Sequence, residues 1–159
     1  MSLLRERTTG SARPLPDEAV LSEPERSRDR RSAALRILGA IAVLVVGAVH
    51  LQQYVSGYSS VRIIGPLFLL NFGGATVIGL GLLVPLARAQ VLHVLLGLGG
   101  IGLAGTSFVF LFVSEHQPLF GFEEHGYRLA IVLALVAEAV AVGTLGAYLA
   151  GRARSRSRR

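Results

Sequence analysis

Cysteine and lysine are both absent from this 159-residue chain, so all 16 basic residues are arginine. Without cysteine there is no disulfide, no cysteine-ligated zinc, no iron–sulfur cluster and no thiol nucleophile. Without a lysine nearby, the glycine pairs Gly73-Gly74 and Gly99-Gly100 do not resemble a phosphate-binding loop. No nucleophile-and-base pair is recognisable either. The sequence therefore predicts no catalytic residue, no cofactor and no enzyme.

Charge is scarce over most of the chain, which is 52% hydrophobic and has a mean hydropathy of +0.56. This is too apolar for an ordinary soluble domain. A membrane-spanning helix needs about 20 apolar residues, and Glu138 is the only charged residue within four windows of that length. The sequence predicts an all-α polytopic membrane protein, an antiparallel bundle of four transmembrane helices. The expected spans are 33–54, 63–85, 91–113 and 129–151.

The arginines gather in two tails. Residues 1–31 are polar and proline-containing, which predicts a disordered tail, and residues 152–159 form a second, arginine-rich tail. Both tails fall on the same side of the four spans as Arg88. The positive-inside rule then predicts a multi-pass protein of the plasma (inner) membrane with both termini cytoplasmic. Arginines beside apolar spans suit the bilayer and its anionic headgroups better than nucleic acid, so no nucleic-acid partner is predicted.

An acidic residue, Glu138, lies near the midpoint of the fourth predicted span. Threading the spans through one bilayer at about 1.5 Å per residue places Asn71, Thr106 and Ser107 at a similar depth, with His50 above them. Intramembrane acids are often functional, which favours a proton-exchanging or cation-binding group. The alternative is a neutral carboxyl that hydrogen-bonds Asn71 or Ser107 and holds two helices together.

Small residues recur at helical spacing in the last three spans. Such residues let helix backbones approach closely in lipid, and they predict packing within the bundle, with a second copy or with a larger membrane partner. The expected packing residues are Gly74, Gly79, Gly97, Gly100, Ala104, Gly143 and Gly146.

A metal site would have to use histidine. His50, His116 and His125 are expected on the outer side, where imidazole with a nearby carboxylate suits zinc or copper. No HxH or HxxH spacing supports this site. A haem would need two histidines at matching depth, whereas His50 and His93 are expected near opposite faces of the membrane.

The stretch from His50 to Tyr54, with Tyr58 and residues 63–71, resembles small bacterial four-helix membrane proteins without an assigned function. The resemblance covers about Ala48 to Gly81 and implies the four-span layout but no functional residues. Small proton-coupled multidrug transporters also have four short helices and a membrane carboxylate. In that family the acid lies in the first helix, whereas Glu138 lies in the fourth span.

Three classes of function follow. The first is a non-enzymatic accessory or interaction subunit that packs through its glycine and alanine faces. The second is a small proton-coupled transporter that uses Glu138. The third is an outer-face metal or redox-associated membrane protein that uses the histidines.

Overall fold

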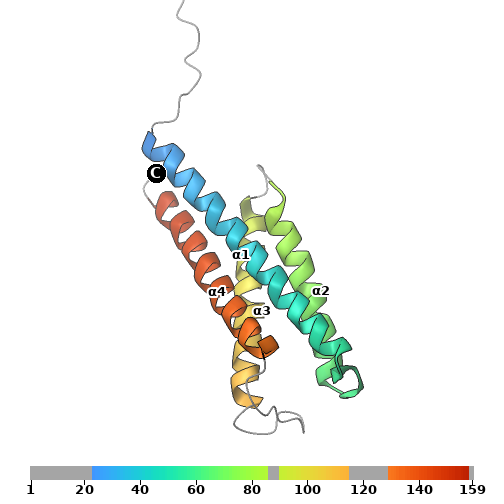
Figure 1. Ribbon diagram of the computed structural model, residues 1–159. Helices are drawn as coiled ribbons and strands as arrows, with labels where there is room; N and C mark the ends of the chain where they lie inside the picture. Colours follow the sequence, from blue (N-terminus) through green and yellow to red (C-terminus); the bar gives the residue numbers. More distant parts are fainter. Residues whose placement is uncertain (1–22, 86–89, 115–128, 158–159) are drawn as a thin grey trace, which may run out of the picture.

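The computed structural model describes residues 23–85, 90–114 and 129–157, and their secondary structure is helical (Figure 1). All four long helices are long and apolar enough to cross a membrane, as the sequence predicts. The elements are α1 (Glu23–Val55), the short 3₁₀ helix η1 (Tyr58–Ser60), α2 (Ile64–Leu83), α3 (Gln90–Ser114) and α4 (Leu129–Arg156).

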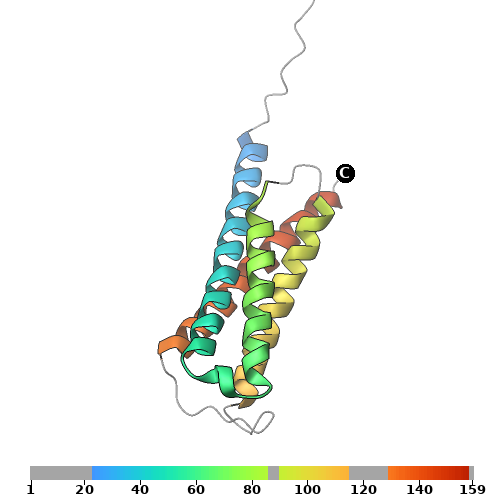
Figure 2. The same cartoon turned by 90° about the vertical axis from the view of Figure 1, so that its right-hand side faces the viewer.

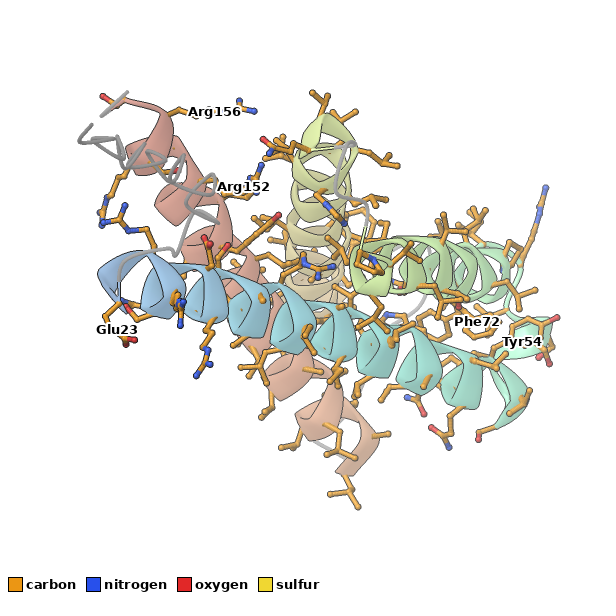
Figure 3. The ribbon with its side chains drawn as sticks, turned by 90° about the horizontal axis from the view of Figure 1, so that it is seen from above. Glu23, Tyr54, Phe72, Arg152 and Arg156 are labelled. Atoms are coloured by element: carbon orange, nitrogen blue, oxygen red, sulfur yellow. The ribbon has the colours of Figure 1, made fainter. Side chains whose placement is uncertain are left out.

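Helix α1 packs along both α2 and α4, and α3 also contacts α2 and α4. The start of α1 and the end of α4 lie at the same end of the molecule, which we call the tail end (Figure 1). The opposite end, where α1 ends and α2 begins, is the far end. Helix α4 is inclined to the others, so its first turns lie apart from the last turns of α3 (Figure 2). Seen from above, α4 crosses α1 at an angle (Figure 3).

Two helices extend beyond the predicted spans. Helix α1 begins at Glu23 rather than near residue 33, and α4 continues through the predicted tail to Arg156. An apolar span that is already helical supplies the costly nucleus, and arginine and alanine propagate a helix well. Arg154 and Arg156 also occupy the last turn of α4, where positive charge interacts favourably with the helix dipole. The remainder of both predicted tails, 1–22 and 158–159, lies outside the described residues.

Toward the tail end and the middle of the molecule, leucine side chains of one helix pack against glycines of a neighbouring helix. A Cβ atom added to Gly39 would lie 2.5 Å from Leu145 Cδ2, and one added to Gly100 would lie 2.7 Å from Leu145 Cδ1. One added to Gly79 would lie 2.5 Å from Leu44 Cγ. Each glycine therefore makes room for a bulky side chain of another helix. The fully buried residues of this core are Ala40, Val43, Ala75, Leu82, Ala104, Ala141 and Leu145.

The small residues that are expected to pack on α4, Gly143 and Gly146, form a ridge that lies away from the other helices. Gly143 is exposed and Gly146 half-buried, and a Cβ atom added to either meets no atom within 4 Å. The prediction that they pack within the bundle is not met in the described residues. Helix α4 instead turns another face, which combines alanines with larger side chains, toward α1 and α3. That face contains Ile131, Ala134, Ala137, Glu138, Ala141, Leu145 and Tyr148.

A polar clamp joins three helices at the tail end. The guanidinium of Arg36 on α1 donates to the carbonyl oxygen of Leu82 and, at 3.5 Å, to that of Val84. On α3, His93 Nε2 lies 3.0 Å from the same Val84 oxygen. The last carbonyls of a helix have no partner within that helix. Arg36 and His93 therefore bind the carboxyl end of α2, where positive charge is also favoured by the helix dipole.

At the far end a tight turn leads from α1 to α2. Gly57 has φ +142°, a conformation that side-chain-bearing residues rarely adopt. A Cβ atom at Gly65 would lie 2.8 Å from the Tyr58 carbonyl oxygen, so the turn folds back directly onto the start of α2. Tyr58 is buried there, with its ring edge against Phe68 at 5.4 Å between ring centroids.

Candidate functional site

A cavity of about 450 Å³ lies toward the far end of the molecule, and all four helices contribute to its wall. It is formed by the end of α1, the first half of α2, the second half of α3 and the first half of α4. The close contacts between glycines and leucines described above lie toward the tail end and the middle of the molecule. The segments of α3 and α4 that line the cavity belong to the parts of these helices that diverge toward the far end (Figure 2).

All five residues of the predicted polar cluster line this cavity. They come from four different helices: His50 from α1, Asn71 from α2, Thr106 and Ser107 from α3, and Glu138 from α4. Matching depth along separate spans was the only argument that grouped them in the sequence. The structure adds that their helix faces converge on one space.

Glu138 is almost completely enclosed, with 1% of its surface exposed. Its Oε2 atom is buried and has no hydrogen-bond partner among the described residues. Taking a carboxyl out of water without a compensating hydrogen bond is unfavourable. Glu138 is therefore the energetically most unusual residue of the cavity wall.

Asn71 bonds to Ser107 rather than to Glu138. Its Nδ2 donates to Ser107 Oγ across the α2–α3 interface. The amide oxygen Oδ1 of Asn71 is buried and has no partner among the described residues. The expected hydrogen bond from Glu138 to Asn71 or Ser107 does not occur among the described contacts, so the interhelical connection is made by the amide and the hydroxyl alone.

The ring of His50 is held in one orientation by two neighbours. Its Nδ1 lies 2.8 Å from the Val46 carbonyl oxygen, and its ring meets the edge of Phe68 at 5.3 Å between centroids. A carbonyl oxygen only accepts, so Nδ1 carries the proton in this bond. In the neutral ring Nε2 is then an acceptor.

Two polar lining residues were missed by the sequence analysis, namely Gln53 and Ser114. Ser114 Oγ donates to the Leu111 carbonyl oxygen at 2.8 Å. Helical spacing could have predicted that both residues share a helix face with the expected polar residues. Gln53 follows His50 on the same face of α1, and Ser114 comes two turns after Ser107 on α3. The remaining wall is apolar and includes Leu67, Phe68, Leu103, Phe110, Leu111 and Ile131.

Of the three histidines expected to form the metal site, only His50 lies among the described residues. His116 and His125 lie outside the described residues. Within residues 23–85, 90–114 and 129–157, no group of three or more histidine, cysteine, aspartate or glutamate side chains is placed to hold a metal ion. His93, at the tail end, is bound to the Val84 carbonyl and does not line the cavity.

Comparison of the chain with protein-family models, with curated proteins and with solved structures finds no match. The function has therefore to be inferred from the cavity and the residues around it. These residues offer a carboxyl, an imidazole, two amides and hydroxyls on a largely apolar wall, a combination suited to binding a small molecule with one polar end.

Proposed function

We propose that the protein is an integral protein of the plasma membrane, an antiparallel bundle with both termini in the cytoplasm and the far end outside. The arginines of the two tails support this orientation. Large apolar side chains also cover the outside of the helices. Leu70 is 70% exposed, Val77 69% and Val91 67%. Exposed apolar surface on this scale suits contact with lipid tails.

The orientation predicts which single cysteines an impermeant thiol reagent labels in intact cells. The chain has no cysteine of its own, so each introduced thiol reports one position. We expect Ser60→Cys, exposed at the far end, to be labelled, and Ser157→Cys, exposed after α4, to be labelled only after lysis. Labelling of Ser157→Cys in intact cells, with Ser60→Cys protected, would show the reverse orientation.

We further propose that the protein binds a small amphiphilic molecule in the cavity and acts as a carrier or receptor for it. One observation carries this proposal: polar residues from four helices line one cavity beside a buried carboxyl oxygen without a partner. Natural proteins leave few buried polar atoms unpaired, and acids inside membrane helices are functional by default. A fold that retains Glu138 there gives up stability for a use of the carboxyl.

The size and chemistry of the wall define how such a molecule would lie. A cavity of about 450 Å³ is within the range of about 300–1,000 Å³ typical of small-molecule sites. The apolar part of the ligand would contact Phe68, Leu103 and Phe110. The polar part would lie at Asn71 and Glu138. The site needs no enzymatic step for this role.

Filling the cavity tests the proposal. Gly102 lines the cavity and Gly105 does not, yet a Cβ atom at either meets nothing within 4 Å. Both leucine variants are therefore expected to fold. In phosphatidylcholine nanodiscs, calorimetric titration with 1-adamantylamine should show binding to the wild type and to Gly105→Leu and at least about 10-fold weaker binding to Gly102→Leu, a loss of about 1.4 kcal/mol. Equal binding to both variants would refute the cavity as the functional site, and so would the absence of wild-type binding of both this amine and the matching alcohol, 1-adamantanol.

The other two functions expected from the sequence are not carried forward. The small-residue ridge that would dock a partner subunit lies on the surface of α4, at Gly143 and its neighbours, and nothing among the described residues indicates what would cover it. The outer metal site depends on His116 and His125, which lie outside the described residues.

A further inference from the structure

Some hydrogen-bonding groups around the cavity have partners within the protein, and others do not. Three donors are already used: Asn71 Nδ2 donates to Ser107, His50 Nδ1 to the Val46 carbonyl, and Ser114 Oγ to the Leu111 carbonyl. Two acceptors are buried without partners, Glu138 Oε2 and Asn71 Oδ1. His50 Nε2 is a further acceptor of the wall, given the proton on Nδ1. Other donors also line the wall, among them the hydroxyls of Thr106 and Ser107, but none of them pairs with Glu138 Oε2 or Asn71 Oδ1.

The cavity wall also carries an acidic group without a cationic partner among the described residues. Glu138 is the acidic residue of the cavity wall, and no arginine is among the described residues that line it. Arg36 is bound to the end of α2, and Arg152 donates to Gln90 Oε1 at 3.1 Å. Arg62 is exposed on the connection between η1 and α2. No described cation of this chain is therefore placed to neutralise a Glu138 carboxylate.

We propose that the occupant of the cavity is a molecule that combines a protonated primary amine with an apolar body. This inference rests on the proposed binding function and adds the class of ligand. A primary ammonium has three N–H donors and no acceptor, which complements a wall with unpaired acceptors. Its positive charge compensates the buried carboxylate of Glu138, whose isolated burial would be costly. The apolar body lies against the aromatic and aliphatic wall.

Two sources provide this chemistry. One is a free hydrophobic amine that enters from water or lipid, and the other is the ethanolamine headgroup of a membrane lipid. Choline headgroups also carry a positive nitrogen but have no N–H donor. Nanodiscs of phosphatidylcholine alone, compared with nanodiscs that also contain phosphatidylethanolamine, therefore distinguish the two sources.

The test compares two probes with the same hydrocarbon cage, 1-adamantylamine and 1-adamantanol, at a pH where the amine is protonated. In phosphatidylcholine nanodiscs, calorimetric titration of the wild type should give at least about 10-fold tighter binding of the amine. Glu138→Gln should weaken binding of the amine by about 10- to 100-fold, the usual range for loss of a charge-assisted hydrogen bond. Its binding of the alcohol should change little. Glu23→Gln makes the same chemical change at an exposed position at the start of α1 and should bind both probes like the wild type.

Each outcome has a defined meaning. If the wild type binds the alcohol as tightly as the amine, the ammonium proposal fails, whatever the behaviour of the Gln variant. If binding of the alcohol is normal and Gly102→Leu abolishes it, the proposed function survives that failure. If neither probe binds the wild type, the proposed function fails as well. Given preference for the amine, weaker binding of it in phosphatidylethanolamine nanodiscs supports the lipid headgroup as occupant, and unchanged binding supports a free amine.

Discussion

Replacement of Glu138 by leucine is expected to stabilise the fold, raising the free energy of unfolding by about 1–3 kcal/mol. The carboxyl oxygen Oε2 is buried without a partner, so the substitution removes an unsatisfied polar group and breaks no described hydrogen bond. Leucine is apolar and of similar size, which suits a wall that is otherwise largely aliphatic and aromatic. The measurement is reversible unfolding in mixed micelles followed by far-ultraviolet circular dichroism. Binding of 1-adamantylamine should be lost in the same variant.

The control is Glu23→Leu at the exposed start of α1, which should change stability by less than about 0.5 kcal/mol. A Glu138→Leu variant less stable than the wild type would mean that the carboxyl holds helices together, the alternative left open by the sequence. Higher stability combined with lost binding is the pattern expected of a functional group kept at the expense of stability.

Addition of one methyl group at Gly47 is expected to destabilise the protein by about 1–3 kcal/mol. A Cβ atom there would lie 2.7 Å from Ala75 Cβ and 3.5 Å from the Phe72 carbonyl oxygen. Neither neighbour is the end of a flexible side chain, so α1 and α2 would have to separate. The matched control is Gly73→Ala on α2, where an added Cβ meets nothing within 4 Å. That change should leave stability unaltered or raise it by up to about 1 kcal/mol, because alanine favours a helix over glycine.

A second substitution tests the cause of the Gly47 effect. Ala75→Gly removes the atom that the new methyl group would meet, so the double variant Gly47→Ala, Ala75→Gly should recover a large part of the lost stability. Unfolding in mixed micelles measures the wild type, the three single variants and the double variant. Equal tolerance of Gly47→Ala and Gly73→Ala would show that α1 and α2 do not approach as closely as described.

Charge and chain length alone predicted most of the helical layout. Within a span of this hydropathy a charged residue is rare, so the windows between the charged residues locate the helices to within a few residues in α2 and α3. The outer bounds of α1 and α4 were missed because arginine is both a topology signal and a good helix former. Helical rise alone placed His50, Asn71, Thr106, Ser107 and Glu138 at compatible depths, and all five line one cavity.

Only the tertiary structure decided which side of each helix faces inward. Helix α4 carries one small-residue face at Ala137 and Ala141 and another at Ala139 and Gly143, and the first is buried while the second is exposed. Apart from Glu138, both faces are apolar and both carry small residues, so hydropathy offers little contrast that would choose between them. The inclination of α4 and the pairing of Asn71 with Ser107 follow from how the four helices fit together. The same fit leaves Glu138 buried without a partner, because the position of a donor depends on neighbouring helices that the local sequence does not specify.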